Sequence, residues 1–190
     1  MNSFYAMISR MKYIDRWGLM NNTKSENISE HSLETAILAH ALATIANVRL
    51  GENLNADRAA VIALFHDATE ILTGDMPTPV KYYNPAIRDA YKTVERVAGE
   101  KLISMLPGDL REEYSRVISN DDEVLERYVK AADKLSALIK CIEEVRMGNN
   151  EFLKAKEATE ASIKSIELPA LDIFMSEFLP SYYLTLDELG

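Results

Sequence analysis

Apolar residues recur every three or four positions along most of this chain, and this pattern limits its fold more than any other feature. The longest such stripe consists of Leu125, Tyr128, Val129, Ala132, Leu135, Ile139 and Ile142. This spacing places apolar side chains on one face of an α-helix. Alternating Val/Ile/Thr-rich runs between turn residues, which would predict strands, are nearly absent. We therefore expect an all-α fold, a single compact multi-helix bundle.

Capping residues, glycines and prolines divide the first half of the pattern into helices. The first should end near Asp15, after Phe4, Met7, Ile8 and Met11. Ser29 is a candidate N-cap for the second helix, whose buried face would contain Leu33, Ile37, Leu38, Ala41, Leu42 and Ile45. Asn55 can cap a third helix that continues through His66 and Asp67 to Gly74. The prolines of the segment 75–79 predict an ordered loop.

The second half divides in the same way. Asn84-Pro85 is an N-cap followed by a first-turn proline, and the helix that it begins would bury Ile87, Ala90, Tyr91, Val94, Val97, Ala98 and Leu102. Pro107-Gly108 ends that helix, and Gly148 ends the long stripe. Two more helices are expected at about 150–165 and 169–179, while Ser181–Gly190 is left unassigned.

Length, charge and cysteine content exclude several classes of protein. A chain of 190 residues fits one domain, 1–190. The net charge of −9 argues against binding a nucleic-acid polymer. No apolar run suits a signal peptide or a membrane span, so we expect a cytoplasmic protein without a membrane partner. Cys141 stands alone, which fits core packing in a reducing compartment.

Two histidines and two aspartates are the candidates for metal ligands. His66-Asp67 pairs an imidazole with a carboxylate, His31 begins the preceding helix, and Asp133 interrupts the long apolar stripe. A mixed nitrogen and oxygen set suits Mn²⁺, Co²⁺, Fe²⁺ or Zn²⁺. A buried Asp133 needs a partner, which could be a metal or a lysine. His40 lies nine residues after His31, so it points to the opposite side of the helix and is interpreted as structural.

Other polar residues near these positions could act on a substrate. Glu70 follows His66 by four residues, and a carboxylate one helical turn from a metal can deprotonate bound water. On spacing alone, a solvated surface glutamate is the more common interpretation. Arg16-Trp17 pairs a phosphate-binding group with a stacking ring. The rigid loop Asp75–Thr78 could grip a sugar or phosphate, and Lys81 is a weaker phosphate candidate.

The order His31, His66-Asp67, Asp133 resembles the motif that names the HD-domain metal-dependent phosphohydrolases. The runs Arg16-Trp17, Glu26–Leu33, His66–Lys81 and Gly148–Leu153 are more specifically similar to the bacterial HD-domain 5′-deoxynucleotidases, and the likeness extends over nearly the whole chain. Those enzymes remove phosphate from 2′-deoxynucleoside 5′-monophosphates with a divalent metal, and they are homodimers.

The resemblance implies a role for each site residue. His31, His66, Asp67 and Asp133 would bind one divalent transition metal per chain, which could be cobalt, manganese, zinc, iron or copper. Glu70, Arg16 and Asp67 would be catalytic. Substrate contacts would come from Arg16, Trp17, Asp67, Asp75, Met76, Pro77, Thr78 and Asp133. The substrate would be a deoxynucleoside 5′-monophosphate, and the partner a second copy of the chain.

Two alternatives stay open at this point. One is another HD-type enzyme, such as a nucleotide phosphodiesterase or a triphosphohydrolase. No histidine is left for a second metal once His31 and His66 share one ion, which disfavours the binuclear phosphodiesterases. The other is a non-catalytic HD module that binds a ligand, which the intact ligand set and Glu70 disfavour.

Overall fold

The computed structural model describes residues 2–81, 83–119 and 122–190. Within these ranges the chain is helical, and its extended pairing is an isolated antiparallel bridge between Asp15 and Asn27. The helices are α1 (Phe4–Ile8), α2 (Ile28–Leu50), α3 (Ala56–Phe65), α4 (Glu70–Thr73), α5 (Thr78–Lys81), α6 (Pro85–Ser104), α7 (Arg111–Ile118), α8 (Glu123–Arg146), α9 (Leu153–Lys164) and α10 (Pro169–Glu177). Short 3₁₀ turns occupy Ser9–Tyr13, Gly108–Leu110, Asn150–Phe152, Leu179–Tyr183 and Leu186–Glu188. The all-α prediction is confirmed.

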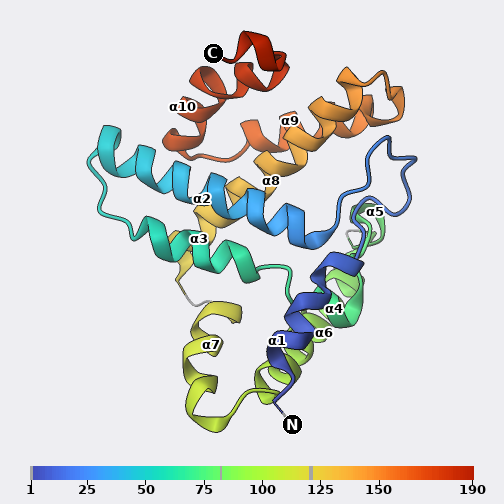
Figure 1. The fold of residues 1–190 in the computed structure, drawn as a ribbon, viewed down its shortest axis with the longest axis vertical. Coiled ribbons are helices and arrows are strands. Elements are labelled where there is room, and N and C mark those ends of the chain that lie inside the picture. The colour runs from blue at the N-terminus through green and yellow to red at the C-terminus, as the bar shows by residue number, and fades with distance from the viewer. Residues whose placement is uncertain (1, 82, 120–121) are drawn as a thin grey trace.

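The helices pack in two groups (Figure 1). The larger group contains α2, α3, α8, α9 and α10 around a core that includes Leu42, Leu135 and Ile142. The smaller contains α1, α6 and α7 around Phe4 and Leu102. The segment between α3 and α4 passes from the first group to the second, so its polar residues lie at the junction of the two cores. None of the described helices has the length and apolar character needed to cross a membrane.

Asn27, and not Ser29, caps α2. The Asn27 side chain accepts hydrogen bonds from the backbone N–H groups of Ser29 and Glu30, and Glu30 Oε2 accepts one from the Asn27 N–H. This reciprocal capping box satisfies donors that a helix N-terminus otherwise leaves open. It starts α2 so that His31 lies in the first turn, next to the chain that enters from the Asp15–Asn27 bridge.

The predicted continuous helix from Asn55 to Gly74 is wrong. Asn55 does cap α3, but α3 ends at Phe65 and the chain makes turns before α4 begins at Glu70. Backbone hydrogen bonds in this stretch span three residues, as from Ala68 N–H to the Phe65 carbonyl and from Glu70 N–H to the Asp67 carbonyl. The break releases His66 and Asp67 from a regular helix and turns them toward α2 and α8.

Several other expectations need correction. Thr78 and Pro79 begin α5 instead of belonging to a loop, because a proline in the first helical turn removes no intrahelical donor. α7 was not predicted, because it is only eight residues long and its short apolar face, which includes Tyr114 and Ile118, is only partly buried against the smaller core. Two further elements end as expected, α6 before Pro107 and α8 before Gly148.

Some residues of the predicted apolar faces are exposed. On α2, Leu33 and Ile37 are 57% and 62% exposed, whereas Leu38 and Leu42 are buried. On α6, Val94 and Val97 are about half exposed. Helix α2 carries apolar residues on all sides, so periodicity alone could not identify its buried face.

Candidate active site

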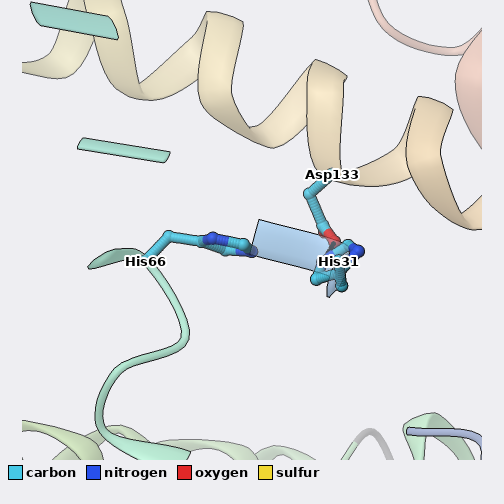
Figure 2. Close-up of side chains that lie close together, drawn as sticks. All are labelled: His31, His66 and Asp133. Atoms are coloured by element: carbon cyan, nitrogen blue, oxygen red, sulfur yellow. Dashed lines mark ion pairs between the residues drawn. The ribbon is translucent and has the colours of Figure 1, made fainter. Parts of the chain in front are cut away.

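Three separate elements bring the predicted metal ligands together. His31 comes from the first turn of α2, Asp133 from the middle of α8, and His66 and Asp67 from the turn after α3. One ligand atom from each of His31, His66 and Asp133 lies within 4.8 Å of the others. Figure 2 shows these three side chains pointing toward one another. The Asp67 carboxylate completes the group, with Oδ2 lying 3.2 Å from His66 Nε2 and 3.5 Å from His31 Nε2.

Hydrogen bonding fixes which nitrogen of His31 faces this cluster. Ser136 Oγ donates to Glu34 Oε2 at 2.5 Å, so its single proton is used, and it accepts from His31 Nδ1 at 3.0 Å. His31 Nε2 is then the ring nitrogen that faces the cluster and can bind a metal. It lies 3.1 Å from Asp133 Oδ1. A proton on Nε2 would be shared with that carboxylate, and a cation bound between the two atoms would take its place.

His66 is oriented in the same way as His31, but by a backbone carbonyl group instead of a serine. Its Nδ1 lies 2.7 Å from the Ala63 carbonyl oxygen, which can only accept, so Nδ1 carries the proton. His66 Nε2 is buried and has no hydrogen-bond partner within the described residues. Two imidazoles with their proton-bearing nitrogens anchored by oxygen atoms, and with acidic side chains opposite their free nitrogens, are the arrangement of metal-binding histidines. The residues therefore fit a divalent metal.

The pKa values show how strongly these groups interact. Burial alone would lower the pKa of His66, but the neighbouring Asp67 carboxylate outweighs burial and raises it to about 9. Burial would raise the pKa of Asp133, yet the contact with His31 holds it well below its usual range. Both carboxylates thus stay ionised near neutral pH. A cation bound by these groups would take the place of the proton that His66 otherwise holds.

Glu70 is an acidic group of a different kind. Its side chain is buried at the start of α4, and Oε2 lacks a hydrogen-bond partner among the described residues. Burial raises its pKa to about 9, and the nearby charges of Asp67 and Asp75 act in the same direction. A buried carboxyl oxygen without a protein partner is able to bind and orient a water molecule.

A cavity of about 640 Å³ opens beside the cluster, and most of the predicted substrate contacts line it. The lining includes Arg16, Trp17, Asp67, Glu70, Asp75, Pro77, Thr78 and Asp133. Arg16 Nη1 is buried and makes no hydrogen bond within the described ranges, although it forms an ion pair with Glu26 Oε2 at 3.5 Å. Its guanidinium lies beside the indole of Trp17, 6.0 Å from the ring centre. The site thus combines a guanidinium group, acidic groups and an aromatic wall.

Met76 and His40 lie outside the site. Met76 was expected to contact substrate, whereas His40 was expected to be structural. Met76 lines neither this cavity nor the neighbouring one of about 720 Å³, which reaches His66 and Glu70 from the side of α6 and α7. His40 is exposed on α2 and lies 3.4 Å from Asp57 on α3, which agrees with its predicted orientation away from His31.

Sequence reasoning missed the residues that hold the site in place. Ser136 and Glu34 orient His31, and each lies three positions after a predicted ligand, Asp133 and His31 respectively. That spacing puts them on the same helical faces as those ligands and could have revealed them. Lys134 and the small residues of α9 that line the cavity, Ala155, Ala158, Thr159 and Ser162, carried no such signal.

Comparison with known proteins gives a consistent result. The model of the YfbR-like 5′-deoxynucleotidase family matches residues 3–182. The 5′-deoxynucleotidase YfbR of Escherichia coli is 48% identical over 191 residues, covering 98% of this chain and 95% of that protein. Among solved structures, an HD-domain phosphohydrolase from Listeria innocua has a TM-score of 0.82 at 23% identity, covering 95% of this chain and 88% of that one.

A second solved structure is the cyanophage S-2L HD phosphohydrolase DatZ, bound to dA and one catalytic Zn²⁺. It has a TM-score of 0.69 at 19% identity and covers 95% of this chain and 96% of its own. At this identity the two structural similarities show the shared HD-domain fold alone. The match to the family model and the identity to the Escherichia coli protein show more: this chain belongs to the YfbR-like 5′-deoxynucleotidase family.

Proposed function

We propose that this protein is a metal-dependent phosphomonoesterase that hydrolyses 2′-deoxynucleoside 5′-monophosphates to deoxynucleosides and inorganic phosphate. One observation carries the proposal beyond family membership. Within the described residues, three buried side-chain atoms without hydrogen-bond partners occur at this site: His66 Nε2, Glu70 Oε2 and Arg16 Nη1. These are a metal ligand, an atom that can bind water and a phosphate-binding donor, which together make up a phosphohydrolase site.

We propose that His31, His66, Asp67 and Asp133 hold one divalent transition metal, whose identity among cobalt, manganese, zinc, iron and copper is open. When bound, such an ion offers positive charge to phosphate oxygens and lowers the pKa of bound water. The charge of the cavity supports this proposal. Its lining carries the carboxylates of Asp67 and Asp133, which would repel a phosphate dianion without a cation beside them.

The chain's own residues then perform three tasks. Arg16 donates to the phosphate oxygens and fixes the direction of the P–O bond that breaks. Glu70 orients the attacking water at Oε2, the atom without a protein partner. The positive charge of a bound metal would favour the ionised form of Glu70, which can then accept the proton of that water. Asp67 and Asp133 border the cavity, so they also contact the phosphate end of the substrate.

Trp17, Asp75 and Thr78 are proposed to recognise the sugar. A rigid indole beside C2′ excludes a 2′-hydroxyl sterically, which an apolar pocket without such a wall does poorly. Asp75 can accept a hydrogen bond from a sugar hydroxyl. Replacing Trp17 with Ala should therefore narrow the preference for dAMP over AMP, measured as the ratio of kcat/KM values, and not merely slow both reactions. A ratio equal to that of the unaltered protein would contradict this role.

The reaction class is tested by phosphate release from a panel of substrates after the metal-free protein is resupplied with single metals. The panel contains deoxynucleoside mono- and triphosphates and a dinucleotide phosphodiester. We expect release from the monophosphate and little from the others. Preferential cleavage of the triphosphate or of the diester would overturn the proposal in favour of another HD-type reaction.

We propose that the protein is a homodimer. Leu33 and Ile37 support this, because they lie one turn apart on α2 and are more than half exposed. Val61 and Leu64 on the adjacent α3 are also partly exposed. Apolar groups gathered in this way mark protein–protein interfaces, and a twofold dimer would bury the same patch on both subunits.

Introducing a charge into this patch should separate the subunits. The Ile37→Glu protein should be monomeric by light scattering at concentrations where the unaltered protein is a dimer. Val124→Glu, a matched change at an exposed valine of α8, should leave the dimer intact. An unaltered protein that is itself monomeric would refute the dimer, and a dimeric Ile37→Glu protein would place the interface elsewhere.

We further propose that residues 1–190 act as one domain in the cytoplasm. The active site supports the first part, since the segment that carries His66 and Asp67 lies at the junction of the two packed groups of helices. The buried, unpaired Cys141 is consistent with a reducing compartment.

A further inference from the structure

Glu26 contacts both Arg16 and Trp17, the neighbouring residues that are proposed to bind the phosphate and the sugar of the substrate. The indole Nε1–H of Trp17 donates to Glu26 Oε2 at 2.9 Å, and Arg16 Nη1 lies 3.5 Å from the same oxygen. The side chains of Arg16 and Glu26 are only 13% and 12% exposed. A single, largely buried carboxylate oxygen therefore joins the group proposed to bind phosphate to the group proposed to exclude the 2′-hydroxyl.

The backbone holds these residues opposite one another. The Arg16 N–H donates to the Glu26 carbonyl at 2.8 Å, and the Ile28 N–H donates to the Ile14 carbonyl at 2.9 Å. These bonds flank the Asp15–Asn27 bridge, so Glu26 is the direct cross-strand neighbour of Arg16. Because Asn27 also caps α2, the same segment places Glu26 relative to His31.

Trp17 has a backbone conformation that needs such support. Its φ of 59° lies in the left-handed region, which costs a bulky residue about 1–3 kcal/mol. The Trp17 carbonyl accepts from the Met20 N–H at 2.8 Å and from Asn22 Nδ2 at 3.3 Å. The ring packs against Phe152 with centroids 5.3 Å apart. These contacts fix the backbone and one ring face, and the bond to Glu26 fixes the direction of the indole edge.

We propose that Glu26 is a positioning residue for both side chains: it sets the preference for deoxyribose through Trp17 and supports phosphate binding through Arg16. Glu26 does not line the substrate cavity, so it acts through these two residues and not by touching substrate. The proposal rests on the proposed function for the roles of Arg16 and Trp17.

The chain offers a direct probe, because Trp17 is its single tryptophan. Tryptophan fluorescence of the metal-loaded protein, with its quenching by acrylamide, therefore reports on this side chain alone. In Glu26→Ala, which removes both contacts, we expect faster quenching and a dAMP-over-AMP ratio reduced roughly tenfold, the effect of losing one hydrogen bond to a charged group. Inhibition by inorganic phosphate should weaken by a similar factor.

Glu26→Gln separates the two contacts. Its amide oxygen still accepts from the indole, so quenching and the dAMP-over-AMP ratio should stay near those of the unaltered protein. Without the charge beside Arg16, inhibition by phosphate should weaken as it does in Glu26→Ala. Glu30→Gln is the matched control, since Glu30 is exposed on α2 and Gln preserves its capping box; it should leave every measurement unchanged.

The outcomes decide the proposal in either direction. If Glu26→Ala does not fold, Glu26→Asp provides the same test, because a shorter side chain cannot reach both partners. If Glu26→Ala or Glu26→Asp showed the same acrylamide quenching and the same dAMP-over-AMP ratio as the unaltered protein, the proposal would be overturned. If the unaltered protein cleaves AMP and dAMP equally, the proposed function fails, whereas the quenching comparison still tests the contact with Trp17.

Discussion

Replacing Glu70 with Gln should lower kcat by about 10²–10⁴-fold while the protein keeps its metal. That range is typical for the loss of a general base. The expectation follows from the buried Oε2 atom, which has no protein partner in the described part of the chain, and from the position of Glu70 beside Asp67 without belonging to the ligand cluster. Gln has the same size as Glu but cannot accept the proton, so packing should be preserved.

Kinetics and metal analysis together distinguish this role from the alternatives. Glu100→Gln, a matched change at an exposed glutamate of α6, should have full activity. If Glu70→Gln retained normal turnover, Glu70 would be a structural residue. If it lost the metal together with activity, Glu70 would be a ligand and not the group that handles the water.

Replacing Asp133 with Ala should abolish stable metal binding and, with it, activity. Asp133 Oδ1 faces His31 Nε2 at 3.1 Å, so both atoms would bind the proposed ion. Metal binding stabilises a folded protein by about 2.7 kcal/mol when free metal is a hundredfold above its Kd. For a chain of this size 1 kcal/mol corresponds to roughly 2–4 °C in Tm. Chelation should thus lower the Tm of the unaltered protein by about 5–10 °C, and the Tm of Asp133→Ala should not respond.

His40→Ala provides the control for this experiment. His40 is exposed and lies beside Asp57, away from the cluster, so its replacement should leave metal content, Tm and turnover near normal. Elemental analysis showing one equivalent of metal in Asp133→Ala would contradict the assignment of Asp133. An equal loss of metal from His40→Ala would contradict the ligand set as a whole.

Helix boundaries could be predicted where a local signal was strong. Asn55 and Asn84 both accept hydrogen bonds from the helices that they cap, as their types and positions indicate. The start of α2 was misplaced because Asn27 and Ser29 are both good caps. Glu30 settles the choice, since it lies three residues after Asn27 and closes a capping box there.

The break at His66 could not be predicted from periodicity. Ala68, Ile71 and Leu72 continue the apolar spacing of α3, although the chain has left the helix. Ala68 is buried in the smaller core, so the same pattern serves two different packing partners. The helical-face argument for Glu70 therefore does not describe this stretch, even though Glu70 lies beside the ligands.

The family resemblance predicted which four residues would come together, but not the residues that hold them in place. His31, His66, Asp67 and Asp133 do meet, from elements up to about a hundred residues apart in sequence. The contacts of Ser136 with His31 and of Glu26 with Trp17 depend on how α8 and the segment before α2 pack. Such tertiary contacts follow from the fold and leave no local pattern.

The most direct test of the proposed function is the ratio of kcat/KM for dAMP to that for AMP, measured by phosphate release with the metal-reconstituted protein. The two substrates share the phosphate and the base and differ by one hydroxyl group, so the ratio isolates sugar recognition. We expect a clear preference for dAMP over AMP. Activity toward dAMP should depend on added metal and should be lost in Asp133→Ala. Equal cleavage of dAMP and AMP would contradict the account of this protein as a deoxynucleotidase.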